Sequence, residues 1–256
     1  MRGAASLAAA LTLLAPAVAG ASREPAALAI AAWPARVVLT APGRATIHVE
    51  NPGVDPVVID AAPSGYRLDL HGRPRLGAAG ALAARVRVHP SRIALAGRSA
   101  VELTVTATRA AAARPGDHAF VVLLTTRLPT GRALLAHLRI GVVVVLRVPG
   151  TVVRRLAVSG LRVERHRRQV LFEVSVANRG NVDEWLARRR LELRLVGHGR
   201  VLARLHGEPR RLLARTRGLV EARYAGRNRG PLTVVVTLTG PRPGVKVLRR
   251  AFQVRL

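Results

Sequence analysis

The chain has 256 residues, no cysteine, 49% apolar residues and a formal net charge of +28. This length leaves room for two domains of ordinary size, and the lack of cysteine excludes disulfides and thiol chemistry. Aromatic residues make up only 3% of the chain, so Val, Leu, Ile and Ala must fill the cores.

Residues 1–21 have the features of a secretory signal peptide. Arg2 supplies the positive start, the apolar stretch 4–14 is too short to span a bilayer, and small-x-small cleavage sites end at residues 19 and 21. No later apolar run approaches the ~18 residues of a membrane span. We therefore predict a secreted or extracytoplasmic protein of the cell envelope without a transmembrane anchor. An uncleaved N-terminal anchor is the alternative.

Residues 30–149 are predicted to form one β-sandwich domain. Apolar residues occupy every second position of 101–107, and turn signals such as Ala96-Gly97 and Pro115-Gly116-Asp117 separate such segments. Strict alternation is typical of antiparallel strands with one buried face. A Gly- and Ala-rich loop is expected at 72–84. The expected strands are 35–40, 46–50, 57–61, 66–70, 86–89, 101–107, 120–124 and 133–148.

Residues 151–256 are predicted to form a second sandwich after a short Pro149-Gly150 linker. A tight turn with one left-handed residue is expected at 178–181, and a short helix at 182–190, where acids precede three arginines. The expected strands are 152–163, 169–178, 191–195, 201–205, 218–224, 232–239 and 245–256. The fold class is therefore all-β, with two tandem immunoglobulin-like β-sandwich domains after a signal peptide.

Arginine is concentrated in the second half of the chain. Residues 22–150 hold 16 arginines and 7 acids, whereas residues 151–256 hold 24 arginines, one lysine and 7 acids. Guanidinium groups suit phosphates and carboxylates, so one converging anionic-polymer site is one interpretation. Separate solvated turns, with arginine raised by codon bias, are the other. The candidate binding residues are Arg165, Arg167, Arg168, Arg188, Arg189, Arg190, Arg210 and Arg211.

The patterns that carry chemistry are missing from the sequence. No serine lies in a G-x-S-x-G context, no phosphate-binding glycine loop occurs, and His198 and His206 have no third ligand at metal-site spacing. Aromatic residues do not interleave with the arginines, which argues against nucleic acid as a partner. We expect no enzyme activity, no cofactor and no metal.

Three segments of the first half, VVLTAPGRATIHVENPG at 37–53, RVHPSRIALAGRSAVELTVTA at 87–107 and GDHAFVVLLTTRL at 116–128, resemble PapD-like immunoglobulin sandwiches. In the second half, VANRGNVDE at 176–184 and RRLLARTRGLVEARYAG at 210–226 resemble cell-surface proteins of the WxL-interacting type. Together these resemblances imply extracellular binding, to peptidoglycan through the first domain and to a partner protein or host surface through the second. The PapD-like resemblance implies basic residues that grip a subunit's terminal carboxylate, with Arg36 as the first and Arg139 or Arg147 as the second.

The leading functional prediction is a secreted binding or scaffold protein of the cell envelope, with peptidoglycan, an anionic wall polymer or a surface protein as its partner. The alternative is an assembly chaperone for exported subunits, which would add a strand of its client to an exposed sheet edge.

Overall fold

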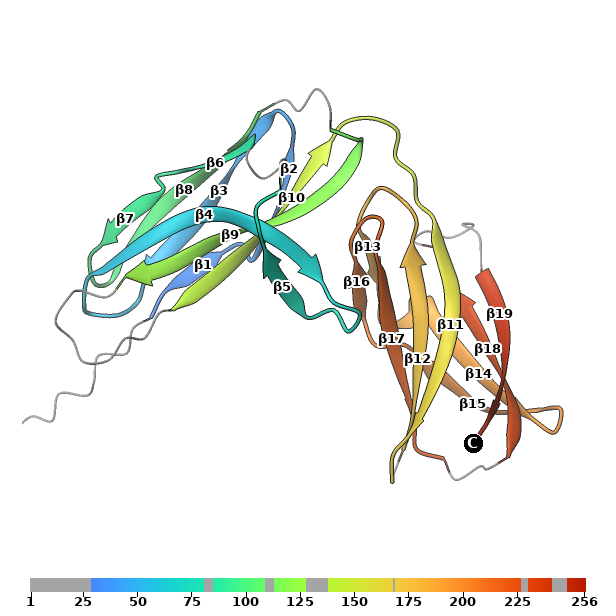
Figure 1. Ribbon diagram of the computed structural model, residues 1–256. Helices are drawn as coiled ribbons and strands as arrows, with labels where there is room; N and C mark the ends of the chain where they lie inside the picture. Colours follow the sequence, from blue (N-terminus) through green and yellow to red (C-terminus); the bar gives the residue numbers. More distant parts are fainter. Residues whose placement is uncertain are drawn as a thin grey trace, which may run out of the picture.

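The computed structural model describes residues 29–80, 85–108, 113–127, 138–167, 169–226, 230–240 and 248–256. Two β-sandwiches follow one another along the chain, joined by an extended segment at 149–155 (Figure 1). The predicted signal peptide lies outside the described residues. In the described ranges, no helix has the length and apolar character needed to cross a membrane.

The first sandwich packs two sheets around a core of aliphatic side chains. One sheet has the order β1 (Ala31–Trp33), β3 (Gly43–Asn51), β8 (Ser99–Ala107), β6 (Val86–His89). The other has the order β2 (Arg36–Thr40), β10 (Arg139–Val148), β9 (Gly116–Arg127), β4 (Val57–Leu68), β5 (Pro74–Gly77), and β7 (Arg92–Leu95) also pairs with β4. The pairing of β2 with β10 is parallel. The chain thus starts in the first sheet with β1 and crosses into the second with β2.

The alternating residues of the sequence point into this core as predicted. Leu103 and Val105 of β8 are fully buried, as are Ile47 on the neighbouring strand β3 and Val122 on β9 in the facing sheet. Intervening residues of β8, such as Glu102, face solvent. The period of two therefore sets which face of each strand enters the core.

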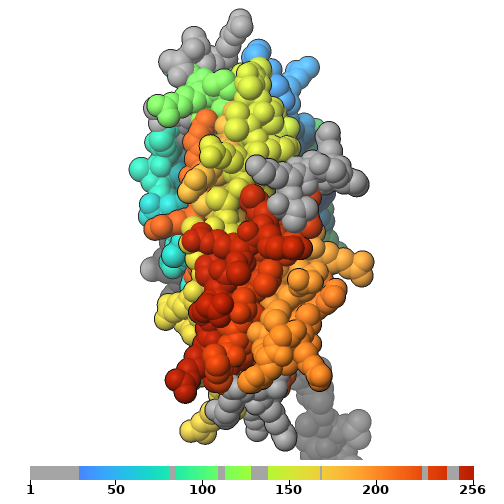
Figure 2. Space-filling model, turned by 90° about the vertical axis from the view of Figure 1, so that its right-hand side faces the viewer, coloured from blue at the N-terminus to red at the C-terminus, as the bar shows by residue number. Residues whose placement is uncertain are grey.

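The second sandwich repeats this design and confirms the predicted fold class. One sheet has the order β11 (Leu156–Arg165), β12 (Val170–Asn178), β17 (Arg217–Tyr224), and the other has the order β15 (Arg200–His206), β14 (Leu191–Gly197), β18 (Pro231–Leu238), β19 (Leu248–Arg255). A short pair, β13 (Glu184–Leu186) with β16 (Arg210–Leu212), lies at the end nearer the first sandwich (Figure 1). The core of the second sandwich includes Phe172, Val174, Leu193 and Val236. Figure 2 looks onto the outer surface of this sandwich, where β19 (red) and the β14–β15 region (orange) are seen.

Two local predictions were wrong. The segment expected as a loop at 72–84 contains β5, which makes a hairpin with β4. The segment expected as a helix at 182–190 contains β13 and a short 3-10 helix at Arg188–Arg190. Glu184 and Leu186 are buried on either side of the exposed Trp185, as in a strand. Arg154 and Arg190 pair with the buried Glu184 carboxylate. The acids therefore do not serve as helix-capping residues.

An asparagine builds the same corner in both sandwiches. The N–H of Gly53 donates to Asn51 Oδ1 (3.1 Å), and the N–H of Gly180 donates to Asn178 Oδ1 (3.0 Å). The Nδ2 of Asn51 donates to the carbonyls of Asp55 and Ala96, and that of Asn178 to the carbonyls of Val182 and Leu213. This Asx turn bends the chain at 178–181 without a left-handed residue there, contrary to the prediction for that turn.

Candidate functional site

Asn181 ties the junction between the sandwiches together. Its Nδ2 donates to the carbonyls of Thr151 (2.7 Å) and Pro115 (3.2 Å), and its own carbonyl accepts the N–H of Asp117 (2.7 Å). Its N–H donates to the Val153 carbonyl (2.9 Å). One residue of the second sandwich thus contacts both the linker and the start of β9, through its side chain and its backbone.

Two buried carboxylates lie beside this asparagine, and each is held by an arginine. The Asp117 side chain is 1% exposed and accepts Nε (2.7 Å) and an Nη (3.0 Å) of Arg147, together with the N–H of Asp183 (3.0 Å). Asp183 accepts an Nη of Arg36 (2.8 Å) and the N–H of Ala214 (3.0 Å). Burial acts to raise the pKa of Asp117, but Arg147, the Asp183 N–H and nearby Arg36 together hold it below its usual range.

We expect Asp117→Asn to lower the free energy of unfolding at pH 7 by about 2 kcal/mol, because Arg147 loses a charge-assisted bidentate partner. Since the pKa of Asp117 is lower in the folded state, this stabilisation is fully present above the unfolded value of ~3.9 and is lost as the pH falls through the folded value. Urea unfolding at pH 7 and at pH 3 measures it. The exposed variant Glu102→Gln is the control, and a wild-type advantage over Asp117→Asn that persists undiminished at pH 3 would contradict the assignment.

The hairpin of β4 and β5 makes a second connection between the sandwiches. The N–H of Leu219 in β17 donates to the carbonyl of Leu70 (2.7 Å), and Arg210 donates to the carbonyl of His71. Within the turn, Asp69 Oδ1 accepts the N–H groups of His71 (3.0 Å) and Arg73 (2.9 Å), and Gly72 takes a positive φ of 76°. The turn is therefore internally braced and attached to the second sandwich through its backbone.

Between these two connections lies a cavity of about 290 Å³ lined by residues of both sandwiches, among them Tyr66, Asp117, Asp183 and Thr216. Burial raises the pKa of the Tyr66 hydroxyl, and this effect outweighs the positive charges of Arg36 and Arg211, which lower it. Burial first, and then the neighbouring Arg36, lower the pKa of Arg211. The Arg211 guanidinium lies 5.3 Å from the centroid of the Trp185 ring. One arginine from each sandwich thus lowers the pKa of the same hydroxyl, which lines the cavity.

The first half of β10 has an unpaired edge. β9 pairs with Arg139 to Val148, but β2 on the other side pairs only with Val143 to Arg147. Within the described ranges, no strand covers the outer edge of residues 139–142. Leu138 and Ile140 beside this edge are only partly buried against the core. This segment therefore offers free backbone groups next to incompletely covered apolar side chains.

The candidate arginines do not form one patch. Arg165 lies at the far end of β11 and donates to the carbonyl of Arg255, and Arg167 is exposed in the adjoining turn. Arg190 is 13% exposed and bonded to Glu184 (3.2 Å), with Arg188 and Arg189 exposed beside it at the opposite end of the sandwich. Arg210 and Arg211 belong to the junction. Arg168 lies outside the described residues, and a binding role for these arginines stays a prediction.

Comparison with known structures identifies similar two-sandwich chains. A chaperone–tip adhesin complex of CFA/I fimbriae biogenesis gives a TM-score of 0.53 at 9% identity, over 87% of this chain and 98% of the other. The fold is similar to that of fimbrial chaperones. The SafA pilin–SafB chaperone complex of Salmonella enterica (TM-score 0.47, 14% identity, 91% and 99% covered) and the CsuC–CsuE complex of Acinetobacter baumannii (0.47, 11%, 87% and 97%) also match. No protein-family model and no curated protein sequence matches the chain.

These matches correct the functional prediction. The leading interpretation, a binding or scaffold protein that holds peptidoglycan or an anionic wall polymer, is contradicted by the match to a chaperone–tip adhesin complex. The match also agrees with the PapD-like resemblance of the first half, whereas the resemblance of the second half to WxL-interacting proteins gains no support.

Proposed function

We propose that this protein is an extracytoplasmic assembly chaperone that holds an exported subunit by adding a strand of that subunit to β10, without catalysing a reaction. The observation that carries the proposal is the unpaired edge of β10 at residues 139–142. An extended peptide that pairs with a free sheet edge gains main-chain hydrogen bonds, and neighbouring apolar pockets select its side chains. Binding would also cover an edge that otherwise invites non-specific pairing.

The hydrogen bonds of neighbouring residues show which backbone N–H and C=O groups point to the free edge. The N–H of Val143 donates to the carbonyl of Ala35, beside β2, whereas Leu138 bonds to Thr126 on the β9 side. Because the direction alternates along a strand, Arg139 and Gly141 present their N–H and C=O groups to the free edge. Leu138 and Ile140 lie on the core face, so apolar side chains of a bound strand would complete the end of the core.

Arg36 stands where a bound strand would end. It opens β2 opposite Val143, just beyond the unpaired segment of β10. Only one Nη of Arg36 bonds to Asp183, and within the described residues the side chain of Arg211 makes no hydrogen bond. We therefore assign Arg36 and Arg211 to the terminal carboxylate of the client, since guanidinium groups bind carboxylates in a bidentate manner. Arg147, expected from sequence as a second gripping residue, is instead committed to Asp117.

Arg139→Pro tests the edge. Proline removes the outward N–H of the first residue of β10 but none of the hydrogen bonds to β9, so the fold should persist while strand addition fails. Arg139→Ala is the matched control, because it removes the charge and keeps the N–H. The chain is co-expressed with exported subunits encoded beside its gene, and complexes are measured by size-exclusion chromatography after a thermal unfolding check.

We expect wild type and Arg139→Ala to form a 1:1 complex with a subunit, and Arg139→Pro to form none at an unchanged melting temperature. If Arg139→Pro binds as well as Arg139→Ala, the edge of β10 is not the binding site. If wild type binds none of the subunits, the chaperone proposal fails.

A further inference from the structure

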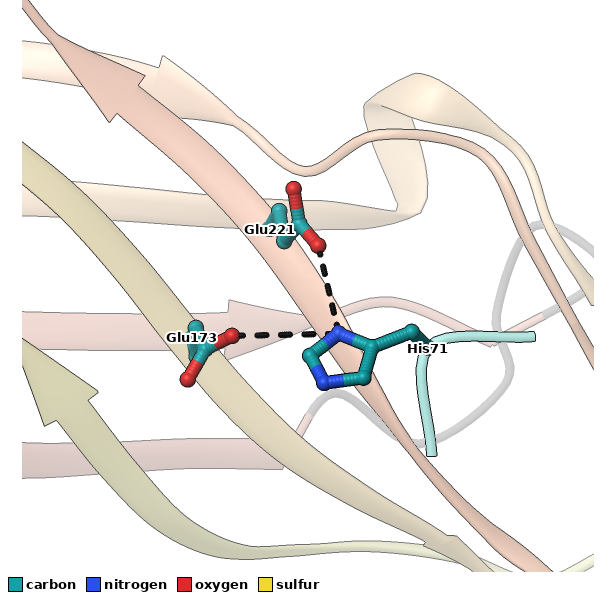
Figure 3. Close-up of side chains that lie close together, drawn as sticks. All are labelled: His71, Glu173 and Glu221. Atoms are coloured by element: carbon teal, nitrogen blue, oxygen red, sulfur yellow. Dashed lines mark ion pairs between the residues drawn. The ribbon is translucent and has the colours of Figure 1, made fainter. Parts of the chain in front are cut away.

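Three potential metal ligands from distant parts of the chain meet where the β4–β5 hairpin touches the second sandwich. His71 Nδ1 lies 3.5 Å from Glu221 Oε1 and 3.9 Å from Glu173 Oε1. Figure 3 shows the imidazole reaching from the hairpin turn over strands β12 and β17, with Nδ1 facing both carboxylates. Within the described ranges, this is the one group of three or more such side chains with ligand atoms close enough to share an ion.

The two glutamates form a pair of like charges at the junction. Glu173 on β12 and Glu221 on β17 are direct cross-strand partners on the outer face of their sheet, where like charges repel. The Glu173 side chain is 4% exposed, and its cross-strand partners are Glu221 on one side and Arg162 on the other. Among the described residues, His71 is the one basic group within ion-pair distance of it, and no hydrogen bond satisfies this carboxylate. Arg223 lies 3.7 Å from Glu221 Oε2, so Oε1 of that residue stays directed at His71. A buried carboxylate beside a second one is stabilised by a cation placed between them.

His71 is held in place independently of its ring. Its N–H donates to Asp69, its carbonyl accepts Arg210, and the preceding carbonyl of Leu70 accepts the N–H of Leu219 on β17. The imidazole is therefore presented to the two carboxylates by a braced backbone. Such preorganisation of a ligand lowers the cost of binding a metal.

We propose that His71, Glu173 and Glu221 bind one divalent transition-metal ion of the zinc class, which links the hairpin of the first sandwich to the sheet of the second. Bonds of ~2.1 Å in a tetrahedron place ligand atoms ~3.4 Å apart. The His71 Nδ1 atom lies 3.5 Å and 3.9 Å from the two glutamate oxygens, which is close to that spacing. One imidazole and two carboxylates form a donor set suited to Zn²⁺ and leave a fourth position for water, whereas Ca²⁺ takes oxygen ligands only. This proposal does not depend on the chaperone function.

The competing explanation is a metal-free ion pair in which the His71 imidazolium, together with Arg223 at Glu221, neutralises the glutamates. In that case the site needs no metal, and adding zinc or a chelator would not change the stability of the junction. A direct measurement of zinc binding and of its effect on stability separates the two explanations.

The experiment uses the full mature chain without a histidine tag, stripped with a chelator and titrated with Zn²⁺ against a chromogenic competitor. We expect one Zn²⁺ per chain and a melting temperature several degrees higher with zinc than with chelator. His71→Ala should weaken zinc binding by at least about tenfold and abolish the thermal shift. The control is the double variant His198→Ala/His206→Ala, which removes two exposed histidines and should leave both readouts unchanged.

Glu221→Gln provides a second test in which the hairpin keeps its histidine, and it too should weaken zinc binding. Zinc binding that is absent in wild type, or equal in wild type and His71→Ala, overturns the proposal. So does a chelator-insensitive melting temperature in wild type, because the ion pair would then hold the junction by itself.

Discussion

Val105→Asp is expected to unfold the first sandwich at 25 °C. Val105 is fully buried in the middle of β8, and no disulfide supports the core. Burying a carboxylate there without a partner costs several kcal/mol, which is comparable with the whole stability of an ordinary domain. Loss of the far-UV circular dichroism signal of folded strands and a lower urea midpoint would show it.

The neighbouring variant Thr106→Asp controls for the new charge. Thr106 lies on the other face of β8, with Arg44 and Arg87 as its cross-strand partners on either side. A carboxylate between two arginines should leave the free energy of unfolding within about 0.5 kcal/mol of wild type or raise it. A melting temperature of Val105→Asp close to that of Thr106→Asp would mean that the register of β8 is wrong.

Asn178→Ala is expected to cost about 3 kcal/mol or more in the second sandwich. The substitution leaves the N–H of Gly180 and the carbonyls of Val182 and Leu213 without their partners in a buried corner. Each buried group left unsatisfied costs about 1–3 kcal/mol. Urea unfolding measures the loss, and Ser159→Ala, which removes an exposed hydroxyl, provides the control. An equal midpoint for both variants would show that the corner is not held by this side chain.

Alternation predicted the strands well because it is a local signal. The expected strand 101–107 appears as β8 at Ser99–Ala107, 169–178 as β12 at Val170–Asn178, and 232–239 as β18 at Pro231–Leu238. Each of these strands buries one face, so the sequence states which residues enter the core. β5 was missed because all of its residues are exposed, so that its apolar and polar positions carry no pattern.

The candidate site was not predictable in the same way, because its contacts join residues far apart in sequence. Asp117 and Arg147, or Arg36 and Asp183, are ordinary polar residues within their own segments and meet only when the two sandwiches come together. His71, Glu173 and Glu221 are a further case, because no short spacing in the sequence links them and only the fold brings them together. The arginine clusters are conspicuous locally, but strand direction sends them to opposite ends of the second sandwich.

Arginine side chains on the edge strands affect how this protein self-associates at high concentration. Arg87 on β6, Arg200 and Arg204 on β15, and Arg249 and Arg250 on β19 are all exposed on strands that end their sheets, two of which are seen in Figure 2. Charged side chains on such strands oppose the growth of one sheet across two molecules. Electrostatic repulsion between these cationic edge strands should therefore keep the protein monodisperse in dilute salt, although several of its sheet edges are exposed. Because salt screens these charges, self-association through the edge strands should appear first at high protein concentration in concentrated salt.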